Sequence, residues 1–377
     1  MLGEKIALSG CSCSDDGRTR RRRGSGLVLV EIALGGAALD GMELTMQGIV
    51  RSGLGKILGV ALAAVLGVGV TGCSTNPATG RSQLNLLSRA HEISIGSEAQ
   101  PQLVAEYGGE VRDPQLRAYV TRVGMSMVEY TEGDFRDLPW EFTLLDSDVI
   151  NAFALPGGKV FVSRGLVQKM TNEAQLAAVL GHEIGHVTAR HANDRISRQL
   201  ILTGVVVGAT VAAGQSDSDL VRVGVPVLVG TTGTGFSLSF DRNQELESDR
   251  LGMRYMTRAG YDPRGMLQLM EILRDASGER SQPEWLSTHP LPETRIRAIE
   301  QRLASGSYSR MIDAPTHSLY EERFRREFLS RLNQLADAGA FNRDVAVGEI
   351  VPIQWGGWTG ECCSGCAGAS CGTSHGH

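Results

Sequence analysis

The sequence is poor in aromatic residues, has little net charge and contains no apolar run long enough to cross a bilayer. Aromatic side chains make up 5% of the 377 residues and the formal net charge is −5, so nothing draws the chain toward nucleic acid. Seven cysteines and eight histidines are modest counts, and their positions are therefore more informative than their number. An apolar share of 42% is that of a soluble globular protein with one large domain or two small ones.

Three apolar stretches are present, and each falls short of the roughly 18 uninterrupted apolar residues of a membrane-spanning helix. The first, residues 57–70, follows Arg51 and Lys56 and has the layout of a secretory signal. The other two, 200–214 and 221–230, are expected to be buried core or a loop that contacts a membrane. An integral-membrane protein is the alternative.

The first apolar stretch ends in Val70-Thr71-Gly72-Cys73, which resembles the lipobox of bacterial lipoproteins. The resemblance implies that Cys73 is acylated and that residues 46–72 are a lipoprotein signal peptide. A cleaved signal followed by an incidental cysteine is the alternative. Ser74 stands where the inner-membrane retention signal of enteric bacteria has Asp, so the resemblance also implies an outer-membrane lipoprotein that faces the periplasm.

Residues 1–45 lie upstream of a complete export signal. They are expected to be a mis-called extension, with Met42 or Met46 as the true start. Two alternatives rest on the run Arg20 to Arg23. It could be a basic arm that binds nucleic acid, or part of a twin-arginine signal whose apolar run is interrupted by Glu31.

After the signal, the sequence predicts one main domain between a polar tether and a C-terminal extension. The expected segments are a lipidated tether (73–88), the main domain (89–305), a helical extension (306–355) and a disordered Gly/Cys-rich tail (356–377). In the tail, Cys362, Cys363, Cys366 and Cys371 could form two disulfides, or bind a metal together with His375 and His377.

Within the main domain, helical and strand patterns alternate. Residues 141–145 and 159–162 have strand composition. Asn172 can cap a helix that should run to about Ser197, with Gln175 completing a capping box. A second helix is expected over residues 242–259, with Gly260 at its end. Another helix should start near Pro292.

The first of these helices contains His182-Glu183-Ile184-Gly185-His186. The two histidines are four residues apart, about 40° around a helix, so both rings point the same way. Neutral imidazoles at this spacing suit Zn²⁺. Glu183 lies about 100° round the helix, where it is free to reach a zinc-bound water rather than the metal. The alternative is a helix with two surface histidines.

A catalytic zinc site needs a third protein ligand and an open position. His191 lies about 140° round from His186 on a continuous helix, so it is expected to lie on the helix surface or to contact a ligand from behind. Glu245 and Asp249 share a face of the second helix, and one could bind zinc while the other holds a histidine N–H. Spacing alone does not exclude Glu247.

These motifs resemble the metallopeptidase family of HtpX and the CAAX prenyl proteases. His182 to His191 matches the active-site helix of that family, and Glu245-x-x-Ser248-Asp249 matches its second-helix motif with Ser in place of Ala. The resemblance implies an α+β, mainly helical, zincin-type (gluzincin) domain with a small sheet beside the active-site helix. It also implies one Zn²⁺ per chain, bound by His182, His186 and Glu245, with Asp249 behind the ligands.

Two further segments extend the resemblance. Asn151-Ala152, in Asn151-Ala-Phe-Ala-Leu-Pro-Gly-Gly158, matches the segment beside which substrate backbone pairs with an edge strand. Ser287-Thr-His289-Pro, with Arg295 six residues on, matches a motif near the metal. The resemblance implies that His289 or Arg295 stabilises the tetrahedral intermediate, or that His289 caps the zinc in a closed resting state.

The opening Cys73 to Leu84 resembles the lipoprotein branch of the family, similar to the periplasmic proteins LoiP and BepA but without the helical repeats of BepA. The resemblance implies a zinc endopeptidase for unfolded or misassembled envelope proteins, with Glu183 as general base. Expected partners are these substrates, the membrane through the lipid, and outer-membrane assembly machinery, but no nucleic acid. A lipoprotein chaperone that binds clients, with cleavage secondary, is the alternative.

Overall fold

The computed structural model describes residues 73–202, 239–277, 283–290 and 293–341. All of them belong to one of two units of the chain, Val60–His377. The expected upstream extension, the signal peptide and the Cys/His-rich tail lie outside the described residues, as do nearly all of the apolar stretches 200–214 and 221–230. In the part of the chain that is described, no helix combines the length and apolar character needed to cross a membrane.

A three-stranded sheet forms the centre of the fold. Its strands are β3 (Glu141–Leu145), β4 (Ala152–Leu155) and β5 (Lys159–Ser163). The order is β3-β5-β4, with β3 parallel and β4 antiparallel to β5. The strands predicted at 141–145 and 159–162 are confirmed. The hairpin between β4 and β5 turns at Gly157 and Gly158, whose φ angles of 83° and 93° suit glycine.

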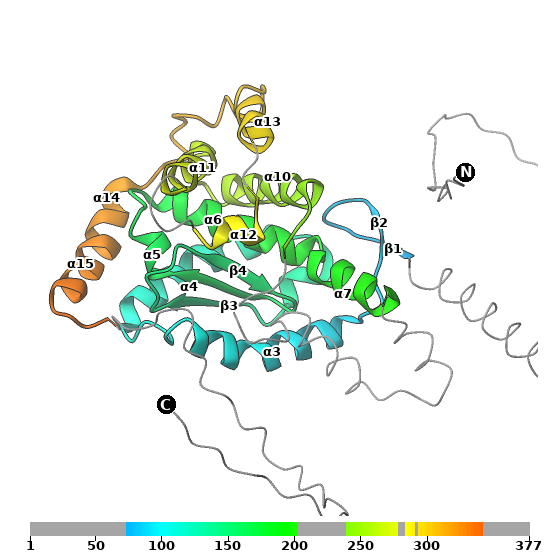
Figure 1. Cartoon of the computed structure of the whole chain (residues 1–377). Helices are drawn as coiled ribbons and strands as arrows, with labels where there is room; N and C mark the ends of the chain where they lie inside the picture. Colours follow the sequence, from blue (N-terminus) through cyan, green and yellow to red (C-terminus); the bar gives the residue numbers. More distant parts are fainter. Residues whose placement is uncertain (1–72, 203–238, 278–282, 291–292, 342–377) are drawn as a thin grey trace, which may run out of the picture. The chain divides into compact units, whose positions relative to one another are not determined.

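Helices make up most of the remaining described chain (Figure 1), so the predicted mainly helical α+β fold with a small sheet is confirmed. The helices that surround the sheet are α3 (Arg89–Glu106), α4 (Pro114–Val128), α5 (Arg164–Val167), α6 (Glu173–Thr188), α7 (His191–Leu202), α10 (Arg242–Arg258) and α11 (Arg264–Ala276). Shorter or more distant segments are the 3₁₀ helix η1 (Gly133–Asp137), α12 (Trp285–Thr288), α13 (Glu293–Leu303), α14 (Glu321–Phe324), the π-helix η2 (Arg325–Leu329) and α15 (Ser330–Asp337).

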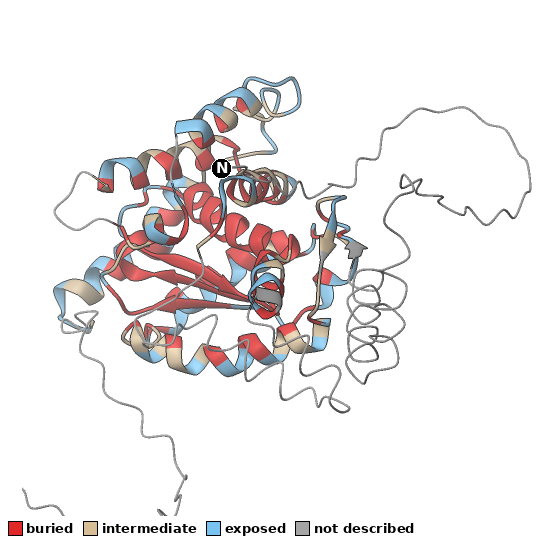
Figure 2. Ribbon diagram, turned by 45° about the vertical axis from the view of Figure 1, so that its right-hand side comes forward, coloured by how far each residue is buried: buried red, intermediate tan, exposed pale blue. Residues whose placement is uncertain are grey.

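The sheet is buried on both faces, which explains why its strands are almost wholly apolar. Phe153 and Phe161 face α3 in one cluster, whereas Ala152, Ala154 and Val162 face α4 and α6 in the other. Figure 2 shows the sheet and α6 in the colour of buried residues. The sheet and α4 therefore form a rigid support for α6.

Helix α6 lies in the middle of the molecule, and each of its residues is buried. Its predicted N-cap is confirmed, because the side chain of Asn172 accepts a hydrogen bond from Gln175 N at 3.0 Å. The predicted capping box is not formed, because the Gln175 side chain accepts from Thr171 N rather than from Asn172 N. At its first residue, the buried carboxylate of Glu173 accepts hydrogen bonds from Tyr119, Tyr261 and Arg323. A carboxylate here also suits the positive end of the helix dipole.

Helix α10 crosses α6 at a very short distance. A Cβ atom on Gly252 would lie 2.8 Å from the backbone nitrogen of His182, and one on Gly185 would lie 3.0 Å from the carbonyl oxygen of Ser248. Only residues without a Cβ permit this approach, so the two glycines bring the acidic segment of α10 against the histidines of α6.

The prediction of one continuous helix from Asn172 to about Ser197 is wrong. Helix α6 ends at Thr188, and Arg190 takes a left-handed conformation with φ of 57° before α7 begins. That conformation is uncommon for a residue with a Cβ. Here it is held because the Arg190 side chain bonds to Glu92 Oε1 at 3.0 Å and to Leu87 O at 2.8 Å.

The segment expected to be a polar tether folds against the domain instead. Strands β1 (Cys73–Thr75) and β2 (Ser82–Leu84) pair as an antiparallel hairpin. Asn76 in the hairpin is buried and donates to Thr188 O at 2.8 Å, and Gln83 donates to Ala189 O at 2.7 Å. These side chains satisfy carbonyl groups that the end of α6 leaves without a helical partner.

The described part of the predicted helical extension contains α14, η2 and α15, which follow one another without a break. It packs into the main core through Phe324, Phe328 and Leu332. Arg323 reaches Glu173 at the start of α6. The described part of the extension is therefore continuous with the main domain rather than a separate appendage.

Candidate metal centre

Four buried side chains from three elements converge beside α6. They are His182 and His186 of α6, Glu245 of α10, and His289 at the end of α12, and their ligand atoms all lie within 4.8 Å of one another. The two histidine Nε2 atoms are 3.0 Å apart. Glu245 Oε2 lies 3.5 Å from His182 Nε2, and its Oε1 lies 3.4 Å from His186 Nε2.

These separations fit a metal ion better than direct hydrogen bonding. Two ligand atoms of a tetrahedral zinc site, each about 2.0–2.1 Å from the ion, are about 3.3 Å apart. Burial opposes a charge on His182, but hydrogen bonds to Asp249 and Glu245 outweigh it and raise its pKa to about 9. A position that holds a proton so firmly is one where a cation is stabilised.

Glu245 is kept ionised by its surroundings. Burial favours the neutral acid, but the charges of His289 and Arg295 hold the pKa of this carboxyl well below its usual range. Burial lowers the pKa of His186 well below its usual range, so its ring is neutral. A neutral imidazole and an ionised carboxylate are the forms that bind a metal.

Glu183 follows His182 on the buried helix and has no exposed surface. Its Oε1 lies 3.8 Å from His289 Nε2, so the side chain reaches the metal cluster without being one of its four groups. Burial raises the pKa of this carboxyl. A carboxylate with a raised pKa is suited to accept a proton near neutral pH.

Asp249 lies behind the cluster, as the sequence predicted. Its Oδ1 is 3.0 Å from His182 Nδ1, on the side of the ring that faces away from the cluster. A carboxylate here fixes the tautomer and the direction of the ring.

Arg295 contacts two carboxylates of the site, and its predicted role in stabilising the intermediate stays a prediction. It is wholly buried, and its guanidinium bonds to both oxygens of Asp249 at 2.6 and 2.8 Å and to Glu245 Oε2 at 2.6 Å. These contacts pair its guanidinium with both carboxylates. Arg295 is a positioning residue for Glu245 and Asp249.

His289 lies among the ligand atoms of the cluster. Its Nδ1 lies 3.0 Å from Glu245 Oε1 and 3.4 Å from His182 Nε2. Trp285 stacks on its ring, with centroids 4.7 Å apart. The histidine is thus fixed among the ligand atoms, and its predicted roles, as an oxyanion donor or as a cap on the zinc in a closed resting state, both stay predictions.

His191 is buried rather than on a helix surface, because the chain turns at Arg190 before α7 begins. Its Nδ1 lies 3.0 Å from His186 Nδ1, and its Nε2 lies 3.3 Å from Glu247 Oε2. Glu247, which spacing left open as a ligand, is therefore outside the metal cluster and faces His191.

Substrate binding by Asn151 and Ala152 stays a prediction, and the structure shows where their backbone groups lie. Asn151 uses its backbone within the sheet, since its N donates to Ser163 Oγ and its O accepts from Ser163 N. In antiparallel pairing, alternate residues face the neighbouring strand. The backbone groups of Ala152 and Ala154 therefore face the outer edge of β4, with which no described strand pairs, and both residues are buried.

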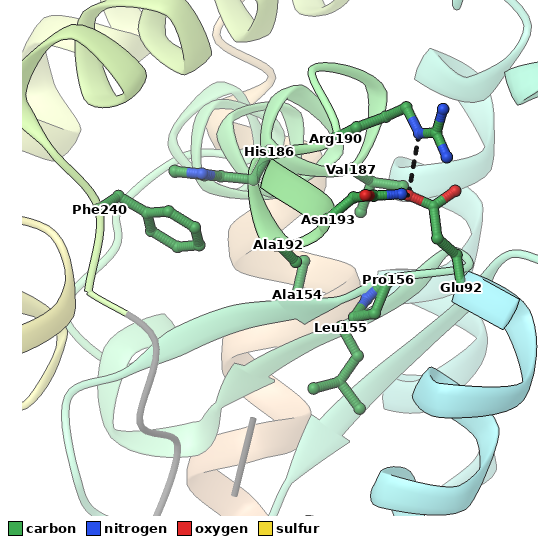
Figure 3. Close-up of a pocket in the computed structure, with 10 residues that line it drawn as sticks. All are labelled: Glu92, Ala154, Leu155, Pro156, His186, Val187, Arg190, Ala192, Asn193 and Phe240. Atoms are coloured by element: carbon green, nitrogen blue, oxygen red, sulfur yellow. Dashed lines mark hydrogen bonds and ion pairs between the residues drawn. The ribbon is translucent and has the colours of Figure 1, made fainter. Parts of the chain in front are cut away.

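A small cleft runs from this edge to His186. Figure 3 shows Phe240 beside His186 at one end and the Arg190–Glu92 ion pair at the other. The ring centroid of Phe240 lies 4.0 Å from that of His186. The sequence did not predict Phe240 and Trp285 as residues of the site. Trp285 stands four residues before His289 and could have been noticed, but no pattern marks Phe240.

Cys73, the predicted lipidation site, is the first residue of β1, three residues before buried Asn76. Its backbone pairs with that of Leu84. Acylation of Cys73 stays a prediction.

Comparison with known proteins agrees with this site. The model of peptidase family M48 matches residues 114–303. The beta-barrel assembly-enhancing protease of Escherichia coli is 36% identical over 235 residues, which are 60% of this chain and 47% of that protein. The mitochondrial metalloendopeptidase OMA1 of Schizosaccharomyces pombe is 31% identical over 240 residues, which are 62% of this chain and 67% of that protein.

The OMA1 metalloendopeptidase of Bos taurus is 29% identical over 240 residues, 61% of this chain and 46% of that protein. The chain thus spans about half the length of several curated relatives that it matches. The family match covers residues 114–303 and includes each of the four groups of the metal cluster. The resemblance drawn from the two helix motifs is confirmed, and the chain belongs to peptidase family M48.

Proposed function

We propose that the protein is a zinc-dependent endopeptidase that hydrolyses peptide bonds of unfolded or misassembled envelope proteins. The observation that supports this most directly is the convergence of His182, His186 and Glu245 on one point, with Glu183 beside them. Two imidazoles and one carboxylate are a frequent ligand set of catalytic zinc. The names of the relatives support proteolysis, since each is called a protease or metalloendopeptidase.

Different residues of the chain have different roles in the proposed hydrolysis. Bound zinc supplies a Lewis acid and a water of lowered pKa. His182, His186 and Glu245 hold the ion, and Asp249 fixes the direction of the His182 ring through Nδ1. Glu183 takes the proton from the attacking water at its carboxylate and passes it to the nitrogen of the leaving amine.

The outer edge of β4, with which no described strand pairs, supports a way of holding an extended substrate once what covers it moves aside. The backbone groups of Ala152 and Ala154 face that edge, and the cleft lined by Ala154 leads to His186. A peptide that adds as a further strand is held by main-chain hydrogen bonds, which depend little on its sequence. Such binding suits unfolded chains, because a folded protein does not offer an extended backbone.

The position of His289 supports a latent resting form. With His289 as a fourth ligand, no position stays open for water. We therefore expect His289→Ala to raise the rate of cleavage of an unfolded substrate several-fold, because the open position is restored. The rate should be measured together with zinc content. A fall in rate at unchanged zinc content would instead assign His289 to the reaction itself.

The proposed site of action is the periplasmic face of the outer membrane, with the chain held there by a lipid on Cys73. The lipobox-like sequence before Cys73 supports it. So does the Escherichia coli relative, whose name places that protein in beta-barrel assembly; the OMA1 relatives are mitochondrial by name. By the same analogy, outer-membrane assembly machinery is a proposed partner.

Zinc analysis and cleavage of casein or an unfolded outer-membrane protein by the purified 74–377 fragment test the proposed function. We expect about one zinc per chain. A chelator should abolish cleavage, and added zinc should restore it, because the chemistry depends on the ion. A protein without zinc would contradict the proposal. A zinc-loaded protein that is inactive even with His289→Ala would favour a client-binding chaperone.

A further inference from the structure

The two zinc-binding histidines proposed above differ in what lies behind their rings. His182 has the carboxylate of Asp249 at its Nδ1. His186 has another histidine there, because His191 Nδ1 lies 3.0 Å from His186 Nδ1. The carboxylate on this side contacts His191 rather than His186, since Glu247 Oε2 lies 3.3 Å from His191 Nε2. All of these side chains are buried.

The chemistry of imidazole determines which ring nitrogen of His186 and of His191 bears hydrogen. If His186 binds a metal through Nε2, its Nδ1 bears hydrogen and donates to His191 Nδ1. His191 must then have its own hydrogen on Nε2, where Glu247 accepts it. Ser248 Oγ, 3.4 Å from His191 Nδ1, can donate to the same acceptor. Each contact agrees with this one arrangement.

We propose that His191 and Glu247 form a two-residue relay that orients His186 and strengthens its bond to the metal. The negative charge of Glu247 polarises the His191 ring, which in turn polarises His186 toward its Nε2. His191 and Glu247 are positioning residues, since neither belongs to the metal cluster. The inference rests on the proposed metal site and assigns a role to residues outside it.

The relay is held in place by the N-terminal hairpin. Arg81, from the connection between β1 and β2, lies 3.3 Å from Glu247 Oε2, and Arg250 lies 3.8 Å from Glu247 Oε1. Asn76 and Gln83 fix the hairpin on the last carbonyl groups of α6. The hairpin after Cys73 therefore contributes to the electrostatics of the metal centre as well as to packing.

A charge-removing substitution of the same shape tests the relay. We expect Glu247→Gln to weaken zinc binding about 10-fold, at the lower end of the effect of residues behind a metal ligand. Affinity should be measured in the full mature chain by competition with a chromogenic chelator. The cobalt-substituted protein should show a shifted visible absorption band, and the melting temperature of the metal-free protein should change little.

Glu173→Gln is the matched control. Glu173 is also a buried glutamate paired with arginine, but it lies at the opposite end of α6, about 13 Å along the helix from His182. This variant should lower the melting temperature of the metal-free protein and leave zinc affinity and the cobalt spectrum unchanged. The two variants together distinguish a residue that strengthens zinc binding from one that stabilises the fold.

A second pair of variants keeps the test decisive. His191→Ala removes the acceptor for His186 Nδ1, whereas His191→Asn keeps an oxygen near the place of Nδ1. We expect the asparagine variant to recover part of the zinc affinity lost in the alanine variant. Unchanged affinity in Glu247→Gln, or equal affinity of the two His191 variants, would overturn the relay. Absence of zinc from the unmodified protein would instead overturn the proposed function.

Discussion

Glu183→Gln is expected to lower the rate of peptide cleavage by about 10²- to 10⁴-fold, the contribution of a general base. Glutamine has the same shape but cannot accept the proton of the attacking water. Because Glu183 lies outside the four-membered cluster, zinc content should stay at that of the unmodified protein. The measurements are the rate on an unfolded substrate and the zinc content of the same preparation.

The stability of the Glu183 variant distinguishes a chemical role from a folding role. Burial raises the pKa of Glu183, so replacing it by a neutral amide should not lower the melting temperature. Glu322→Gln is the control, because Glu322 is exposed and pairs with Arg325 in the C-terminal helix; its rate and stability should be unchanged. Full activity of Glu183→Gln would contradict the assigned general base.

Arg295→Met should lower the free energy of unfolding of the metal-free protein by about 3–5 kcal/mol, as when one partner of a buried ion pair is removed. The reason is that Glu245 and Asp249 both stay buried and would lose the cation that they share. Bound zinc would compensate the negative charge of Glu245, so the decrease in the free energy of unfolding should be smaller in the zinc-loaded protein. Denaturant unfolding with and without zinc measures the difference.

Arg297→Met is the matched control for Arg295. It is on the same helix, but its side chain is 69% exposed and pairs with exposed Glu293. Pairs of this kind contribute about 0.3–0.5 kcal/mol. If Arg295→Met left stability and zinc affinity intact and reduced only the catalytic rate, Arg295 would act on the substrate rather than position the two carboxylates.

Local patterns predicted the elements that hold the metal cluster. The Asn172 cap, the four-residue spacing of His182 and His186, and the motif that begins at Glu245 are all contained within one helix each. The family resemblance added His289, which the structure brings into the cluster. These features are predictable because a helix converts sequence spacing directly into a common face.

The features that the sequence did not predict depend on contacts between distant residues. The turn at Arg190 is held by Leu87 and Glu92, about a hundred residues away, and no glycine or proline marks it. The position of His191 follows from that turn. Proximity of Arg295 to the metal was implied by resemblance. Its pairing with Glu245 and Asp249 was not, since that depends on the path of α13 relative to α10.

If Cys73 carries a lipid, as proposed above, the docked hairpin limits how far the domain can lie from the membrane. Only Ser74 and Thr75 separate Cys73 from Asn76, which is buried against α6. At about 3.3 Å per residue, the chain from Cys73 to Asn76 spans at most roughly 10 Å. An acyl chain on Cys73 would therefore hold the active-site helix at a nearly fixed height above the lipid, and substrates would be selected by their distance from the membrane before any side chain is recognised.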